Sequence, residues 1–153
     1  MKADLTDTRR LQDATAWRVL HLARRLRHSL AVSLEAWGAD LSPEQYFILF
    51  QLAEEDGRVQ RDLGDPVLDD RANITRLVST LADRGLVTRR ADPRDARAKR
   101  VALTEAGRAL FESLRPRVVA ERQRLFADLT PEQLDGFEAV LTALNAAALP
   151  RQP

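Results

Sequence analysis

A helix predicted over residues 71–84 carries side chains that can recognise the edges of nucleic-acid bases. Four apolar residues at helical spacing define its buried side, namely Ile74, Leu77, Val78 and Leu81. Because a helix turns by about 100° per residue, the outward side of its first half presents Arg71, Ala72, Asn73, Thr75 and Arg76. Arginine can form two hydrogen bonds to guanine, asparagine can do so to adenine, and alanine can contact a thymine methyl group. The alternative interpretation is an ordinary solvated helix face.

Basic side chains are concentrated directly after this helix. The chain has 24 Lys and Arg residues and 23 Asp and Glu residues, which is a net charge of +1. Residues 84–100 hold seven basic residues and two acidic ones, a local charge of +5 in an otherwise slightly acidic chain. Arginine can enter a narrow minor groove, and lysine and flanking arginines can contact phosphates. Arg94, Arg97 and Lys99 are therefore candidate DNA contacts, and the alternative is a solubilising surface hairpin.

A β-hairpin is predicted in this basic segment. Residues 86–90 and 100–103 have strand character, and the polar connection between them, residues 91–99, contains turn residues. Asp92 and Asp95 lie in the connection, where acidic groups would not contact phosphate. We expect each of them to pair with a neighbouring arginine and to fix the shape of the loop.

Two further helices are predicted before the hairpin. Ser42, Pro43 and Gln45 form a capping box with proline at the first helical position, which predicts a helix over residues 43–55. This helix is apolar on nearly every side, so we expect it to be buried on nearly every side. A short helix of about one and a half turns is predicted over residues 60–65, before Pro66. With the helix over 71–84 and the hairpin, this order is the layout of a winged helix.

Long helices flank this central region. The first is predicted over residues 11–37, where Gly38 ends it, and another over residues 104–129, which Pro116 should kink. A second capping box beginning at Thr130 starts the last helix. The predicted fold class is therefore mainly α with a small β-hairpin wing. The outer helices are longer and more apolar than a winged helix itself requires.

Four motifs in this order resemble the signature of the multiple-antibiotic-resistance regulator (MarR) family. They are T-R-L-V at 75–78, L-A-D-R-G-L-V at 81–87, D-P-R-D-A-R at 92–97 and V-A-L-T-E-A-G at 101–107. The similarity spans nearly the whole chain, from Ala14 to Ala148. The D-x-R-D-x-R motif followed by L-T-x-x-G is specific, whereas a lone helix–turn–helix would be weak evidence.

The resemblance implies a winged helix-turn-helix homodimer that binds a pseudo-palindromic operator in double-stranded DNA, usually as a repressor. Residues 1–40 would form an N-terminal dimerisation helix, residues 41–103 the DNA-binding lobe and residues 104–153 the C-terminal dimerisation helices. Interlocking of the first and last helices would account for their apolar faces. Two-fold symmetry would place the two recognition helices about 34 Å apart, one turn of DNA.

The resemblance also implies a role for individual positions. The helix over 71–84 would lie in the major groove, Arg97 would reach the minor groove from the wing tip, and Asp95 would brace the wing. The expected DNA contacts are Arg71, Asn73, Thr75, Arg76, Arg94, Arg97 and Lys99. The sequence departs from the family pattern at Leu63-Gly64-Asp65-Pro66, because glycine and proline weaken the short helix that supports the recognition helix.

Many members of this family release DNA when a small aromatic or phenolic anion binds between the dimerisation helices and the DNA-binding lobe. The candidate ligand-binding residues here are Trp17, His21, Tyr46 and Phe50, with His28 on the same helix as the first two. The alternative is that these rings belong to the core or to the dimer interface and that the histidines are simply solvated.

Several function classes have little or no support. Cysteine is absent, which excludes disulfides, thiolate zinc sites and thiol switches. We expect no metal site and no cofactor, because the chain has only two histidines. No glycine-rich phosphate loop, G-x-S-x-G or H-E-x-x-H motif indicates an enzyme. No apolar run approaches the length of a membrane span and the start has no apolar leader, so we expect a cytoplasmic protein.

The function predicted from the sequence is therefore sequence-specific regulation of transcription. We expect a repressor that a small aromatic ligand releases from DNA. Two alternatives remain open: a helical module that binds other proteins, and an architectural DNA-binding protein that responds to no ligand.

Overall fold

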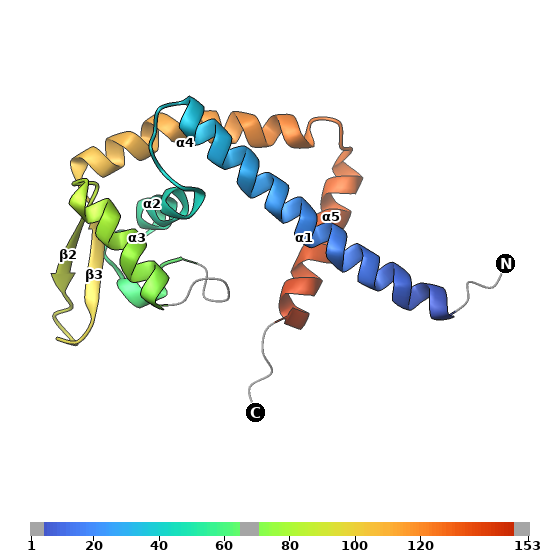
Figure 1. The fold of residues 1–153 in the computed structure, drawn as a ribbon, viewed down its shortest axis with the longest axis horizontal. Coiled ribbons are helices and arrows are strands. Elements are labelled where there is room, and N and C mark those ends of the chain that lie inside the picture. The colour runs from blue at the N-terminus through green and yellow to red at the C-terminus, as the bar shows by residue number, and fades with distance from the viewer. Residues whose placement is uncertain (1–4, 65–70, 149–153) are drawn as a thin grey trace. The chain divides into compact units, whose positions relative to one another are not determined.

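The computed structural model of the chain describes residues 5–64 and 71–148 (Figure 1). The fold is mainly helical with one small antiparallel sheet, which confirms the predicted fold class. None of the described helices is long and apolar enough to cross a membrane. The elements in chain order are α1 (Leu5–Ala36), α2 (Pro43–Glu54), β1 (Arg58–Val59), the 3-10 turn η1 (Gln60–Asp62), α3 (Arg71–Asp83), β2 (Val87–Ala91), β3 (Lys99–Leu103), α4 (Glu105–Phe126) and α5 (Pro131–Ala148).

The chain divides into two compact units between Arg115 and Pro116. The first unit holds α1 to β3 and the first half of α4, and the second holds the rest of α4 and α5. Helix α4 continues through Pro116 and ends at Phe126, three residues before the predicted end. The contacts and hollows described below all belong to the first unit.

Helix α2 begins with the predicted capping box. The Gln45 N–H donates to the Ser42 hydroxyl over 3.2 Å, and the Ser42 N–H donates to the Gln45 side-chain oxygen over 2.9 Å. These two bonds satisfy backbone donors that a helix start leaves without partners. Ile48, Leu49 and Leu52 are fully buried, as expected. The expectation of burial on nearly every side is wrong at Phe47, which is 42% exposed because it lies on the flank away from this buried stripe.

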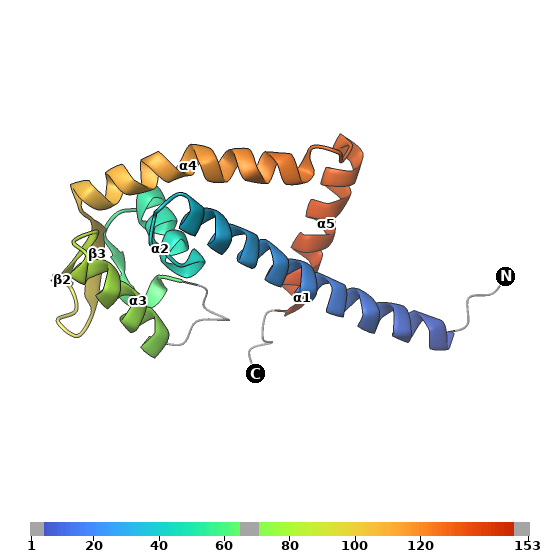
Figure 2. The same ribbon diagram turned by 45° about the horizontal axis from the view of Figure 1, so that its top comes forward.

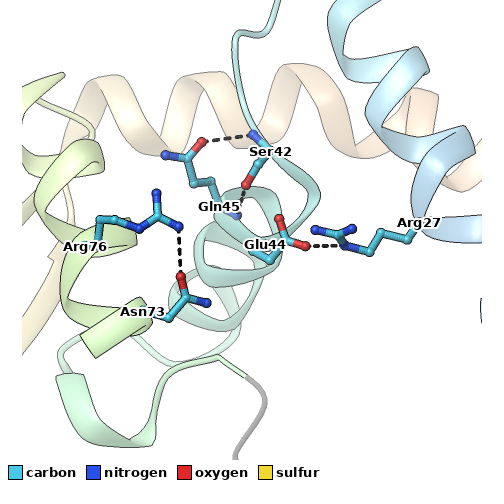
Figure 3. A network of polar contacts seen from close by, with 6 residues as sticks. All are labelled: Arg27, Ser42, Glu44, Gln45, Asn73 and Arg76. Atoms are coloured by element: carbon cyan, nitrogen blue, oxygen red, sulfur yellow. Dashed lines mark hydrogen bonds and ion pairs between the residues drawn. The ribbon is translucent and has the colours of Figure 1, made fainter. Parts of the chain in front are cut away.

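An ion pair joins α1 to the start of α2. Arg27 donates a hydrogen bond to the Glu44 carboxylate, as Figure 3 shows. Burial would raise the pKa of Glu44, but the bonds from Arg27, from its own N–H and from the Ser42 hydroxyl outweigh it and lower the pKa. A carboxylate also suits the positive end of a helix dipole. Glu44 therefore stays charged at neutral pH.

The sheet has three strands rather than the predicted two. Its order is β1-β3-β2, and both pairs are antiparallel. Arg58 and Val59 of β1 pair with Val101 and Arg100 of β3. A strand of two residues carries no alternation in the sequence, which is why the sequence did not predict it.

The predicted short helix is a single 3-10 turn, η1, that ends at Asp62. The expected one and a half turns over residues 60–65 are therefore wrong for the described part of this segment. Gly64 has a φ of +78°, a left-handed conformation that no helix interior contains. Asp65 and Pro66, which the prediction also used, lie outside the described residues.

Helix α3 lies beside the β2–β3 hairpin in both views of the fold (Figures 1 and 2). Its predicted apolar stripe is buried, as expected for the four residues Ile74, Leu77, Val78 and Leu81. Gly85, with a φ of +69°, ends the helix. The N–H groups of Gly85 and Leu86 donate back to the carbonyls of Ala82 and Leu81, both over 2.9 Å.

The start of α4 packs against the end of α3 through Thr104 and Gly107. The Thr104 hydroxyl accepts from the Gly107 N–H over 3.0 Å and donates to the Gly85 carbonyl over 2.6 Å. A Cβ atom on Gly107 would lie 1.9 Å from the Leu86 carbonyl oxygen. Glycine at this position therefore lets α4 approach the backbone that leads from α3 into the sheet.

Gly107→Ala should destabilise the protein, because the added methyl group overlaps a backbone oxygen that cannot rotate away. We expect a loss of about 1 to 3 kcal/mol, the usual cost of overpacking, measured by denaturant unfolding. Gly136→Ala is the matched control, since no atom beyond its chain neighbours and the backbone of its own helix lies within 4 Å of its added Cβ, and alanine favours a helix interior. Equal stability of the two variants would contradict the close approach at Gly107.

Candidate nucleic-acid interface

The first half of α3 presents the predicted recognition residues on one face. Arg71, Thr75 and Arg76 are exposed and Asn73 is half-buried. Figure 3 shows the Arg76 guanidinium donating to the Asn73 side-chain oxygen, a bond of 2.9 Å. Because residues three apart on a helix are neighbours, this bond holds the arginine over the helix surface before any ligand binds.

Thr75 links this face to the preceding turn. Its hydroxyl donates to the Arg71 carbonyl over 2.8 Å and accepts from the Gln60 side-chain amide over 3.1 Å. Gln60 belongs to η1. The 3-10 turn thus contacts the outward face of α3 directly, although it is shorter than the predicted supporting helix.

Asp92 is the acidic residue that anchors the wing. Its side chain is only 5% exposed and its carboxylate lies 2.6 Å from the Arg100 Nε. The carboxylate also accepts from the Arg94 N–H over 2.7 Å. That backbone bond lowers the pKa of Asp92; burial opposes the shift, and the charge and hydrogen bond of Arg100 add to the lowering. The expected pairing of Asp92 with an arginine is therefore present.

Asp95 acts on the wing in a different way from the predicted pairing. Its carboxylate accepts from the Arg97 N–H over 3.0 Å, and its carbonyl accepts from the Ala98 N–H over 2.9 Å. These backbone bonds within the tip have the geometry of a tight turn, and the Asp95 backbone also hydrogen-bonds the Asp92 carboxylate. Asp95 therefore shapes the turn that carries Arg97. The ion pair with an arginine, which was predicted for both acidic residues, is made by Asp92 with Arg100.

Arg100 is a structural residue. Besides the Asp92 carboxylate, its guanidinium binds the Gly57 carbonyl over 2.8 Å. It therefore ties the wing to the turn before β1, and its charge is matched within the protein. The basic side chains that remain exposed on the hairpin are Arg89, Arg90, Arg94, Arg97 and Lys99.

A hollow of about 550 Å³ lies between η1, α3 and the wing. Five of its lining residues are cationic and one, Asp95, is acidic; the cations are Arg61, Arg71, Arg89, Arg97 and Lys99. Three of these were predicted as DNA contacts, whereas Arg61 and Arg89 were not. The hollow joins the recognition face and the wing into one strongly positive surface.

Strand register separates Arg89 from its neighbour Arg90. Arg89 pairs with Val101, which is fully buried, and Arg90 pairs with Arg100. Directly opposed residues point to the same face of a sheet, so Arg89 lies on the face of the sheet that packs on the core and lines the hollow. Arg90 lies on the other face. Alternation along the predicted strand could have shown this difference in the sequence.

The predicted ligand-binding residues form two separate pairs. Trp17 and His21 stack on exposed α1, with ring centroids 5.0 Å apart. Tyr46 is 4% exposed and packs against Phe111, which Phe50 also contacts. The two hollows that the structure describes in this unit are lined by other residues. Within one chain, the four residues are therefore not brought together.

Side chains suited to metal binding do not cluster in the described part of the chain. No group of three histidine, aspartate or glutamate residues there is placed to hold an ion. His28, like His21, is an exposed residue of α1.

Comparisons with known proteins agree with this geometry. The sequence pattern of the MarR family matches residues 41–99. The HTH-type transcriptional regulator MhqR of Bacillus subtilis is 28% identical over 108 residues, which cover 69% of this chain and 74% of MhqR. A MarR-family transcriptional regulator from Rhodococcus sp. RHA1 has a similar structure, with a TM-score of 0.75, 27% identity and coverage of 94% of this chain and 98% of that one.

A further solved structure is that of the PcaV transcriptional regulator from Streptomyces coelicolor in complex with its natural ligand. It is 32% identical to this chain, with a TM-score of 0.66, and the match covers 84% of this chain and 92% of that one.

Asp92→Asn should lower the melting temperature most at neutral pH. The lowered pKa means that the charged carboxylate stabilises the fold above the unfolded pKa of about 3.9, and that this stabilisation is lost as pH falls through the folded pKa. The difference from the wild type should therefore shrink as pH falls below about 3.9 in thermal unfolding followed by circular dichroism. Asp95→Asn, which keeps an acceptor for the Arg97 N–H, is the control. A difference for Asp92→Asn that does not vary with pH would contradict the ion pair.

Proposed function

The chain belongs to the MarR family of DNA-binding transcription regulators, and we propose that it is a homodimeric repressor of a pseudo-palindromic operator. The observation that carries this proposal is the positive surface that α3 and the braced wing form together around the hollow. A helix face with base-reading side chains beside a rigid basic hairpin suits one DNA duplex, with the helix in the major groove and the hairpin tip in the minor groove. Its proposed location is the cytoplasm, where operator DNA lies.

We assign the DNA contacts by their place on this surface. Arg71, Asn73, Thr75 and Arg76 of α3 would contact base edges, and Arg97 would enter the minor groove. Arg94 and Lys99 would contact phosphates, which position the protein without reading sequence. The Asp95 turn would aim Arg97, since its carboxylate holds the Arg97 N–H.

A second copy of the chain is the proposed partner of the outer helices. Helix α1 exposes large apolar residues along its length, namely Trp17, Val19, Leu20, Leu22, Leu26 and Val32. Helix α5 does so as well, at Phe137, Val140 and Leu144. Exposed apolar surface of this kind marks an interface, and a two-fold dimer matches a palindromic site. We therefore keep residues 1–40 and 104–153 as dimerisation segments and 41–103 as the DNA-binding lobe.

Release by a small aromatic or phenolic ligand is the proposed regulation. PcaV has been crystallised with its natural ligand, and the stacked Trp17–His21 pair offers an exposed aromatic surface. Burial of Tyr46 against Phe111 favours a core role for that ring, so the proposed ligand contacts are Trp17 and His21 first, then Phe50 and Tyr46. An architectural DNA-binding protein without a ligand is the alternative outcome.

Selection of bound sequences from random DNA tests the proposal. The selected sequence should be pseudo-palindromic, with half-sites one helical turn apart, about 10 base pairs. Light scattering should give twice the mass of the chain, and a panel of aromatic acids should weaken binding. A monomer, or a protein that selects no sequence, would refute the proposal, and insensitivity to the whole panel would favour the alternative without a ligand.

Arg89→Ala should weaken binding to the selected sequence and reduce its salt dependence, because Arg89 lines the positive hollow. The slope of log affinity against log salt concentration should fall by about 0.9, the contribution of one phosphate contact. Arg90→Ala is the matched control, with the same change of charge on the other face of the sheet. Fluorescence anisotropy over a salt series measures both slopes, and equal slopes for the two variants would contradict the assignment.

A further inference from the structure

The C-terminal end of α3 is tied to the connection between α1 and α2 by Arg84. Its Nη1 donates to the Asp40 carbonyl, and its Nη2 donates to the Ala39 carbonyl over 3.3 Å. Nη2 also lies 3.6 Å from the Asp40 carboxylate. One side chain therefore joins two segments that are more than 40 residues apart in the sequence.

The connection needs such a donor because its backbone belongs to no regular element. Gly38 ends α1 with a φ of +71°, and Asp40 has a φ of +48°, also in the left-handed region. Ala39 and its neighbour Leu41 are buried. The Ala39 carbonyl accepts in a part-buried bond, where a donor is required, and the Asp40 carbonyl accepts in an exposed one. The planar guanidinium can supply both donors at once, whereas the ammonium of lysine is a single point of charge.

The Asp40 carboxylate contributes little to this contact. It is 90% exposed, while the Arg84 side chain is 30% exposed. Exposed ion pairs are weak because water screens them. The contact is therefore chiefly between the guanidinium and two backbone carbonyls, so the charge of Asp40 can be removed without breaking it.

We propose that Arg84 is a positioning residue that sets the spacing between the two recognition helices of the dimer. This proposal rests on the proposed function, in which α1 pairs the subunits and α3 reads DNA. If α1 is fixed in the dimer, the contact at Arg84 fixes how far, and at what angle, each α3 stands from the two-fold axis. A change of that angle alters which spacing between the two operator half-sites fits the two α3 helices.

Arg84 is poorly placed to contact DNA itself. It follows the last residue of α3, whereas the base-reading residues lie in the first half of the helix, about 12 to 20 Å away along an ideal helix axis. Its guanidinium is already bound to the protein on the α1–α2 side. Its removal should therefore change spacing preference without changing the number of phosphate contacts.

The test compares three operators in fluorescence anisotropy. They are the sequence that the wild-type protein selects from random DNA, and the same sequence with one base pair added or removed between the half-sites. In Arg84→Ala, the preference for the selected spacing should fall about three- to tenfold, the effect of a perturbed coupling residue. The salt slope should stay that of the wild type. Asp40→Asn is the matched control and should keep the wild-type preference, since asparagine tolerates a positive φ and leaves the carbonyl in place.

Other results would overturn the proposal. A salt slope lower by about 0.9 would make Arg84 a phosphate contact, and an equal loss on all three operators would make it a general stability residue. If Arg84→Ala does not fold, the same spacing test is made with Arg84→Lys. This variant keeps the positive charge but replaces the planar group that donates two hydrogen bonds. A wild-type preference in that variant overturns the proposal. Failure of the proposed function would instead be seen in the wild-type protein, as no spacing preference at all.

Discussion

Repulsion among like charges is the constraint that the wing has to satisfy. Arg89, Arg90, Arg94, Arg97 and Lys99 are all exposed on one hairpin, and without an opposing interaction such a loop would spread apart. The buried Asp92 carboxylate supplies that interaction, because it binds Arg100 and the Arg94 N–H at once. Arg100 in turn donates to the Gly57 carbonyl in the turn before β1. The tip can therefore present its cations in one geometry, which lowers the entropic cost of ordering the loop on a ligand.

The recognition helix is positioned in the same way, by contacts that lie, with one exception, away from its outward face. At its end, Gly85 and Leu86 meet the start of α4 through Thr104 and Gly107. Arg84 binds the α1–α2 connection. On its first half, Gln60 holds Thr75 from η1. Apart from the Gln60–Thr75 bond on the outward face, the contacts that place α3 lie at its C-terminal end, and they leave the other exposed side chains of its first half without a positioning role.

The features that could be predicted from the sequence are those with a local physical cause. The apolar stripe of α3, the capping box at Ser42 and the hairpin each follow from residues within a few positions of one another. Strand β1 could not be predicted, because two residues show no period and pair only with β3. The contact of Arg84 with Ala39 and Asp40 joins residues 45 and 44 positions apart, so no local pattern indicates it. Arg89 is an intermediate case, since alternation along its strand distinguishes its face but not the hollow beside it.

Counting charges along the sequence therefore misjudges the surface that we propose meets DNA. Of the seven basic residues between positions 84 and 100, Arg84 and Arg100 bind carbonyls and carboxylates within the protein. The negative charge of Asp92 is paired with Arg100, so it does not reduce the positive electrostatic potential of the exposed tip. The salt dependence of binding reflects phosphates neutralised at the interface rather than formal net charge. A protein with a net charge of +1 can hence carry a strongly positive reading surface, provided that buried pairs remove the acidic groups from it.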